Sequence, residues 1–269
     1  MGLPCYAMNQ PTFPEMYEQC LVGPLFRPWA EIALDQVNLA SGDRLLDIAC
    51  GTGIVARTAS ERLGDTSSIV GIDISRDMLA VAKKTAPGID WREGNAMALP
   101  LQDGERFNVI VCQQGLQFFP DKHAAVSQMR RAAAPGSRVA VSTWRSDDEI
   151  PFFRGLRRIA ERHLGEIVDQ RHSFGDTAAL EKLLRDAGFL EVRSRIISRI
   201  IRFNSDTWLL RGNAMALVGM SAGGKTLDEA EKHRVVDSIV TESECVRERY
   251  SDGPELAFEL STNLATARG

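Results

Sequence analysis

The chain has 269 residues, 44% of them hydrophobic and 25% charged, and its formal net charge is −4. This composition is typical of a globular protein that can bury a full core. It argues against nucleic acid as a partner, because phosphate-binding surfaces need a basic excess. No apolar run approaches membrane-spanning length, so we expect no stable membrane insertion. Five scattered cysteines form no C-x-x-C pair, which predicts no disulfide framework and no metal site and favours the reducing cytoplasm.

The N-terminal segment, residues 1–40, is expected to form a helical cap over one end of the core. Apolar residues over 13–38 recur at helical spacing. Pro24 and Pro28 are expected to break this stretch, which gives one or two helices.

Residues 41–145 alternate between strand-like and helix-like runs and are expected to form the cofactor-binding core. Such alternation predicts a doubly wound parallel sheet, whose ligands bind beyond the carboxyl ends of the strands. The expected strands are 43–49, 68–73, 89–94, 107–113 and 137–144, and the expected helices are 53–63, 76–85 and 121–133.

The alternation changes after Trp144. We expect helices near 150–165 and 176–187, a strand over 190–203, a helical stretch over 205–250 and a last strand over 256–267. We interpret residues 205–250 as a helical lid insertion over the substrate pocket, within a single domain that spans 1–269. The expected fold class is α/β, with a Rossmann-like, doubly wound sheet of seven strands.

A glycine turn joins the first expected strand to its helix in LLDIACGTGIVAR, residues 45–57. Gly51 and Gly53 lack Cβ atoms where the backbone must turn and approach a ligand, and the helix start offers unpaired N–H groups. The same spacing satisfies the dinucleotide fingerprint, so the glycines alone leave several cofactors possible.

Two acidic residues at strand ends favour a cationic cofactor. Asp47 would repel a pyrophosphate and attract the sulfonium and ammonium groups of S-adenosylmethionine. Asp73 ends the second strand, where a carboxylate can accept hydrogen bonds from ribose hydroxyls.

Five sequence blocks, the glycine turn included, occur in a specific order. They are LLDIACGTG from Leu45, VGIDIS-x-x-ML from Val70, EGNAMALP from Glu93, FNVIVCQQGLQFFPD from Phe107 and PGSRVAVSTW from Pro135. Together they resemble the class I S-adenosylmethionine-dependent methyltransferases, especially the small-molecule branch that includes the ubiquinone and menaquinone C-methyltransferases. The resemblance covers roughly residues 40 to 145.

This resemblance implies S-adenosyl-L-methionine as the cofactor. Met78 would cover the adenine, and Tyr17 would close over the methionine carboxylate. Asn95 replaces the family's usual Asp, and Ala49 stands where many relatives carry the first glycine. The implied cofactor-binding residues are Tyr17, Asp47, Ala49, Gly51, Thr52, Gly53, Asp73, Ile74, Met78, Asn95, Ala96 and Gln113.

Four residues are candidates for the acceptor site and for catalysis. Gln114 and Gln117 follow the fourth strand, in a loop that faces cofactor and acceptor in the family. A general base would help a phenol or carbon acceptor, and His163 and His172 are the histidines we favour for it. Each of the four also has a structural alternative, as a cap or a packing residue.

The expected function is transfer of a methyl group from S-adenosylmethionine to oxygen, nitrogen or carbon of a small molecule, by a monomer or homodimer. A lipid-like acceptor, either a quinone or a phospholipid headgroup, is the first alternative. It is suggested by the shared helical face of Arg154, Arg157, Arg158 and Arg162. A non-catalytic adenosylmethionine-binding module and an NAD(P)-dependent oxidoreductase remain as alternatives of another class.

Residues 219–226, GMSAGGKT, match the pattern of a phosphate-binding loop. We interpret them instead as a glycine turn between two helices. Thr226 and Glu229 have the spacing of a capping box, which would start the second helix.

Overall fold

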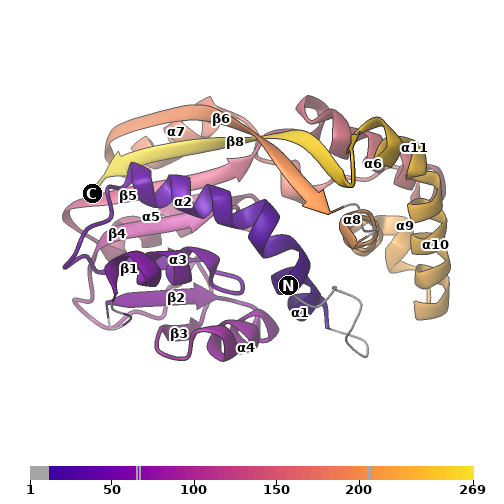
Figure 1. The fold of residues 1–269 in the computed structure, drawn as a ribbon. Helices are drawn as coiled ribbons and strands as arrows, with labels where there is room; N and C mark the ends of the chain where they lie inside the picture. The colour runs from indigo at the N-terminus through magenta and orange to yellow at the C-terminus, as the bar shows by residue number, and fades with distance from the viewer. Residues whose placement is uncertain (1–11, 65, 67, 205–207) are drawn as a thin grey trace. The chain divides into compact units, whose positions relative to one another are not determined.

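The protein is described by a computed structural model that covers residues 12–64, 66, 68–204 and 208–269 (Figure 1). Its sheet has the strand order β3-β2-β1-β4-β5-β8-β6, and the short β7 pairs with β8. Neighbouring strands from β3 to β5 run parallel, whereas β8 runs antiparallel to β5. The bounds are β1 Leu45–Ile48, β2 Ile69–Asp73, β3 Asp90–Glu93, β4 Phe107–Gln113, β5 Ala133–Trp144, β6 Leu190–Asn204, β7 Ser251–Asp252 and β8 Glu255–Arg268. The predicted doubly wound α/β fold is confirmed, and β7 adds a two-residue strand to the predicted seven.

Helices cover both faces of the parallel strands. Leu45 and Val109 belong to the apolar cluster that includes α2, α3 and α4, whereas Leu46 and Ile110 belong to the cluster that includes α5 and α7. Successive side chains therefore point to opposite covered faces, which explains why these strands are continuously hydrophobic. The bounds are α2 Arg27–Gln36, α3 Ile54–Leu63, α4 Arg76–Thr85, α5 Lys122–Ala132 and α7 Thr177–Asp186.

The N-terminal cap forms an unbroken helical segment over the part that the structure describes, and residues 1–11 lie outside it. The segment consists of α1 Phe13–Met16, the π-helix η1 Tyr17–Phe26, and α2. The predicted break near Pro24 is wrong, because Pro24 lies inside η1, and Pro28 lies in the first turn of α2. The change from π to α winding between the two prolines alters the hydrogen-bond ladder at the place where proline N–H groups are missing.

The chain divides into two compact units. Unit 1 comprises Met1–Trp144, Phe174–Ile197 and Thr262–Gly269, and unit 2 comprises Arg145–Ser173 and Ser198–Ser261. Unit 1 holds the glycine turn and all of the expected cofactor-binding residues. The single-domain organisation predicted from the sequence stays a prediction.

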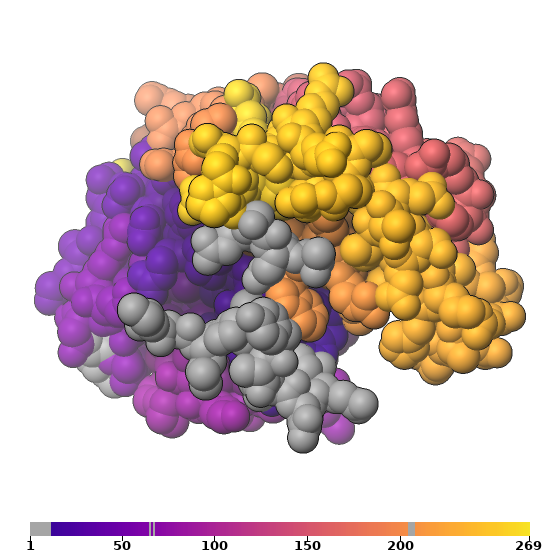
Figure 2. All heavy atoms as spheres, turned by 45° about the vertical axis from the view of Figure 1, so that its right-hand side comes forward, coloured from indigo at the N-terminus to yellow at the C-terminus, as the bar shows by residue number. Residues whose placement is uncertain are grey.

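Unit 2 is mainly helical and has an apolar cluster of its own. Ile159 of α6, Leu217 of α8 and Ile239 of α10 are buried in this cluster. The residues of α10 and α11 form one continuous surface in the space-filling view (Figure 2, deep yellow). Helices fill the stretch from Trp208 to Arg249 as expected, residues 205–207 lie outside the described chain, and the role of a lid remains a prediction. The bounds are η3 Asp147–Glu149, α6 Pro151–Leu164, η4 Gln170–His172, α8 Trp208–Met220, α9 Ala222–Lys225, α10 Glu229–Glu242 and α11 Glu244–Arg249.

The glycine-rich stretch 219–226 ends α8 and forms α9, which agrees with a turn between helices. The Ser221 side chain accepts a hydrogen bond from the Gly224 N–H, 2.9 Å away, and a Cβ on Gly224 would lie 2.0 Å from the Val218 carbonyl oxygen. The predicted capping box is wrong by two residues. Asp228 and Glu231 form it, and Thr226 donates its hydroxyl to the Gly223 carbonyl.

Among the described helices, none has the length and apolar character needed to cross a membrane. Within the same residues, His, Cys, Asp and Glu side chains form no group of three that could hold a metal ion. The four described cysteines, Cys20, Cys50, Cys112 and Cys245, are free thiols.

Candidate functional site

The turn after β1 has a left-handed backbone at the carboxyl edge of the sheet, which is strained only at Ala49. Ala49, Gly51 and Gly53 have φ values of 56°, 56° and 88°, all in the left-handed region. A Cβ on Gly51 would meet no atom within 4 Å. Gly51 therefore leaves open space beside the turn, as close approach of a ligand requires.

Gly53 has a different role from the one expected. A Cβ at this position would lie 2.2 Å from the indole ring of Trp91, so Trp91 occupies the space that the missing side chain leaves. The second glycine is required by packing against β3 rather than by a ligand. Ala49 is accommodated in turn by Gly115, whose Cβ would lie 2.5 Å from the Ala49 Cβ.

Asp47 is a buried carboxyl group at the start of this turn, 1% exposed. Its Oδ2 accepts a hydrogen bond from the Ala56 N–H in the first turn of α3, 3.1 Å away. Burial, with a smaller contribution from the charge of Asp73, raises the pKa of Asp47 to about 8. No ion pair with Asp47 exists within residues 12–64, 66, 68–204 and 208–269. A cation at this edge would stabilise the ionised carboxylate.

Asp73 clamps the turn from the neighbouring strand. Its Oδ2 accepts a hydrogen bond from the Gly51 N–H, and its Oδ1 accepts one from the Ser75 N–H, both at 2.8 Å. Each carboxylate oxygen has a second lone pair, so the expected bonds to ribose hydroxyls remain possible. The clamp itself was not anticipated from the sequence.

The residues expected around the adenine follow β2 and β3. Ile74 is an exposed apolar side chain, at 69%, and Met78 is half-buried on α4. Asn95 accepts a hydrogen bond on Oδ1 from the Met97 N–H at 2.9 Å, which leaves its side-chain N–H₂ group to face a ligand. Ala96 is buried beside it. These positions provide an apolar surface and an amide donor.

The N-terminal cap contacts the same edge within unit 1. The ring of Tyr17 packs 5.0 Å from that of Phe26, and burial together with the charge of Asp73 raises the pKa of Tyr17, which keeps its hydroxyl neutral. Gln113, at the end of β4, donates from its side-chain amide to the Phe26 carbonyl at 3.2 Å. Arg57 of α3 pairs with Glu18 at 2.7 Å. These contacts tie the cap to the turn.

Buried acceptors that lack donors lie at the end of β4, in the loop after it and in the turn after β1. Gln114 has a φ of 54°, and its side-chain N–H₂ donates to the Thr262 hydroxyl at 2.9 Å. The Oε1 atoms of Gln113 and Gln114, and the Thr52 hydroxyl, are buried without a hydrogen-bond partner in the described chain. Gln117 is buried nearby and donates to the Gln114 carbonyl. Unsatisfied buried acceptors are costly unless a ligand supplies donors.

The two candidate histidines lie in unit 2. His163 places Nε2 2.7 Å from Glu242 Oε1. His172 is buried, which lowers its pKa, and its Nδ1 lies 2.7 Å from the Arg145 carbonyl oxygen. A carbonyl can only accept, so Nδ1 carries the proton and Nε2 is left as the basic nitrogen. The glutamines and histidines thus belong to separate units, and the catalytic role of each stays a prediction.

The arginine-rich face of α6 is partly neutralised, because two of its four arginines form ion pairs. Arg157 pairs with Asp147, Asp148 and Glu161, and Arg162 pairs with Glu242 at 2.8 Å. This face therefore offers less charge to an anionic headgroup than the sequence suggests.

The edge as a whole fits S-adenosylmethionine chemically. It combines open space at Gly51, a buried carboxyl group without a cationic partner at Asp47, and orphaned acceptors at Thr52 and Gln113. A ligand with cationic and N–H or O–H groups would complement these features, whereas a pyrophosphate would meet two carboxyl groups.

Comparison with known proteins agrees with this geometry. Residues 45–136 match the family described as a methyltransferase domain. The chain therefore contains a methyltransferase domain. It is 29% identical over 184 residues to a demethylmenaquinone methyltransferase of Lactococcus lactis, covering 61% of this chain and 72% of that protein. It is 35% identical over 123 residues to the chloroplast 2-phytyl-1,4-beta-naphthoquinone methyltransferase of Arabidopsis thaliana, covering 43% of this chain and 47% of that protein.

Solved structures show the same fold. A putative methyltransferase from Bacillus halodurans superimposes with a TM-score of 0.56 at 20% identity, covering 89% of this chain and 97% of that one. The family match and the relatives support an S-adenosylmethionine-dependent methyltransferase that acts on a small molecule. The five sequence blocks therefore identified the family correctly.

Proposed function

We propose that the carboxyl edge of unit 1 binds S-adenosyl-L-methionine and that the enzyme transfers its methyl group to a small-molecule acceptor. The observation that carries this proposal is Asp47, a buried carboxyl group with a pKa of about 8 and no cationic partner among the described residues. The positively charged sulfonium and ammonium groups of S-adenosylmethionine would complement this carboxyl group.

Each of the residues at this edge would have a distinct role in binding the cofactor. Asp47 favours the cationic end of the cofactor through Coulomb attraction in a poorly solvated site. Asp73 holds Gly51 in the conformation that keeps the edge open, and it keeps lone pairs for the ribose. Met78 and Ile74 provide the apolar surface for adenine, and Asn95 provides an amide donor.

When bound, the cofactor supplies an electrophilic methyl group on a positively charged sulfur. Displacement from such a centre depends mainly on in-line alignment of the nucleophile and on exclusion of water. Gln114 suits an aligning role, because its backbone is strained and its Oε1 is a buried acceptor without a donor. A hydroxyl or N–H group on the acceptor molecule would satisfy it.

Calorimetry with S-adenosylhomocysteine tests the cofactor site. We expect one molecule bound per chain, and we expect Asp47→Ala to weaken binding at least tenfold, a loss of about 1.4 kcal/mol. Asp77→Ala is the matched control, because Asp77 is an exposed carboxylate in the first turn of α4. Equal affinity of both variants and the wild type would refute the role of Asp47.

A lipid-like quinone is the second candidate acceptor. The named relatives act, by their names, on demethylmenaquinone and on a phytyl naphthoquinone. The apolar side chain of Phe118 is exposed in unit 1, at 48%, in the segment that follows β4 at the carboxyl edge. Such a side chain suits an apolar acceptor.

Labelled methyl transfer separates the two acceptor classes. The enzyme is incubated with methyl-labelled S-adenosylmethionine and either a reduced demethylnaphthoquinone with a prenyl tail or a water-soluble metabolite extract. Label in the prenylated product alone supports the quinone. Label in soluble products alone supports a polar small molecule, and binding without any transfer supports the non-catalytic module.

A further inference from the structure

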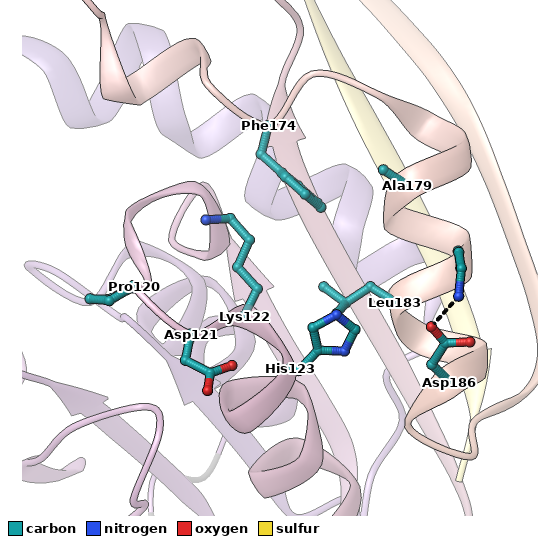
Figure 3. A pocket seen from close by; sticks show the side chains of 9 residues that line it. Pro120, Asp121, Lys122, His123, Phe174, Ala179, Leu183 and Asp186 are labelled. Atoms are coloured by element: carbon teal, nitrogen blue, oxygen red, sulfur yellow. Dashed lines mark hydrogen bonds and ion pairs between the residues drawn. The ribbon is translucent and has the colours of Figure 1, made fainter.

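A cavity in unit 1 lies between the start of α5 and α7, and no residue of the glycine turn lines it (Figure 3). It has a volume of about 580 Å³. Small-molecule pockets commonly span roughly 300–1,000 Å³, so this cavity can hold a small organic ligand but not a folded partner. None of the expected cofactor or acceptor residues lines it.

The inner wall of the cavity is apolar. Phe174 extends into it from the segment before α7, and Ala179 and Leu183 face it from α7 itself (Figure 3). Leu183 is 4% exposed and belongs to the core cluster on this face of the sheet, and Phe174 packs against that cluster. The wall would bury the apolar body of a ligand.

One cation at the rim has no carboxylate partner in the described chain. The Lys122 ammonium donates a hydrogen bond to the Phe119 carbonyl at 3.0 Å and lies 5.4 Å from the centroid of the Phe174 ring. These two contacts fix its position and leave N–H groups available to a ligand.

The other charged side chains around the cavity form a hydrogen bond or an ion pair within the protein. Asp121 caps α5 by accepting the Ala124 N–H at 2.9 Å, and Lys182 pairs with Asp186 at 2.6 Å. His123 also lines the cavity, is exposed, and has no side-chain partner in the parts of the chain described here. The rim thus presents the Lys122 ammonium, the Asp121 carboxylate, one imidazole and the Lys182–Asp186 ion pair next to an apolar wall.

We propose that this cavity binds a free, monomeric medium-chain carboxylate, with the carboxylate on Lys122 and the chain against Phe174, Ala179 and Leu183. A single unpaired ammonium favours a single negative charge, and the apolar wall favours an aliphatic body. The site is independent of the proposed methyl transfer.

Binding of decanoate below its aggregation concentration tests this proposal. Calorimetry is expected to give one molecule bound per chain, with unchanged affinity when S-adenosylhomocysteine is present. Decanol, which has the same chain without the charge, is expected to bind at least tenfold more weakly. Absence of decanoate binding, or its displacement by S-adenosylhomocysteine, would overturn the assignment.

Two matched pairs of variants locate the site. Lys122→Gln is expected to weaken decanoate binding about tenfold, whereas Lys83→Gln, at an exposed lysine of α4, should leave it unchanged. Ala179→Glu places a charged side chain in the cavity and should abolish binding, whereas Ala178→Glu, at the exposed neighbour on α7, should not. Retained binding of S-adenosylhomocysteine shows that each variant is folded. Decanoate binding that all four variants preserve would also refute the proposal.

Discussion

The turn after β1 and the loop after β4 lie at the same edge of the sheet, yet their polar groups are used in opposite ways. Around the turn, Asp47 and Asp73 are both bonded by backbone N–H groups, at Ala56, Gly51 and Ser75. In the loop, the amide oxygens of Gln113 and Gln114 are buried without donors. The carboxyl groups beside the turn are held by the protein's own N–H groups, whereas the two glutamine oxygens, like the Thr52 hydroxyl, need a ligand to supply hydrogen-bond partners.

The largest expected effect is a difference in stability between alanine variants of the two glycines of the turn. Gly53→Ala should destabilise the protein by about 3 kcal/mol, because the new Cβ would overlap Trp91 and φ is positive. Gly51→Ala should cost only about 1 kcal/mol, since it meets open space, but it should weaken cofactor binding. Urea denaturation and calorimetry measure the two effects. Similar destabilisation by both variants would contradict the distinct roles of the glycines.

Removal of the Asp73 clamp should have the next largest effect. Asp73→Ala leaves the N–H groups of Gly51 and Ser75 without their acceptors, with an expected loss of about 2 kcal/mol in the free energy of unfolding. The affinity for S-adenosylhomocysteine should fall with it. Asp73→Asn retains one acceptor oxygen, so its stability and its affinity for S-adenosylhomocysteine should lie between those of Asp73→Ala and the wild type. An alanine variant with wild-type stability would show that the clamp does not hold the turn.

Substitution in the loop after β4 should change binding of the methyl-acceptor molecule rather than the stability of the protein. Gln114→Met removes the orphaned oxygen at similar volume, so the stability should change by less than about 1 kcal/mol. Once an acceptor is identified, its KM should rise about tenfold, while the affinity for S-adenosylhomocysteine stays constant. Thr262→Val is the control, because it removes the partner of the Gln114 amide, together with the hydroxyl's own hydrogen bond to the Thr143 carbonyl, and keeps the Gln114 oxygen. A loss of cofactor affinity in Gln114→Met would assign this residue to the cofactor side.

The sequence predicted the features of the site that depend on local signals. β4 and α4 have the predicted bounds, because continuous apolar runs and a serine N-cap are local signals. The acidic strand ends and the glycine turn were also recognisable, and they led to the correct family. These features depend on residues that are close together in the chain.

The contacts that shape the site are not local. Asp47 bonds Ala56, nine residues away, and Trp91 fills the space beside Gly53 from another strand. The side chains of Gln114 and Thr262 form a hydrogen bond across 148 positions of the chain. Tertiary contacts of this kind leave no periodic signal in the sequence.

The central claim is that Asp47 in the free protein holds a proton that a cationic cofactor displaces. Its pKa of about 8 implies that S-adenosylmethionine binding should strengthen from pH 6 to pH 8, as the ionised form becomes available, and then level off. Calorimetry in buffers of different ionisation enthalpy measures both the affinity and the protons released. We expect up to one more proton released by the wild type than by Asp47→Asn near pH 7. Identical proton release and identical pH dependence in the two proteins would contradict the account.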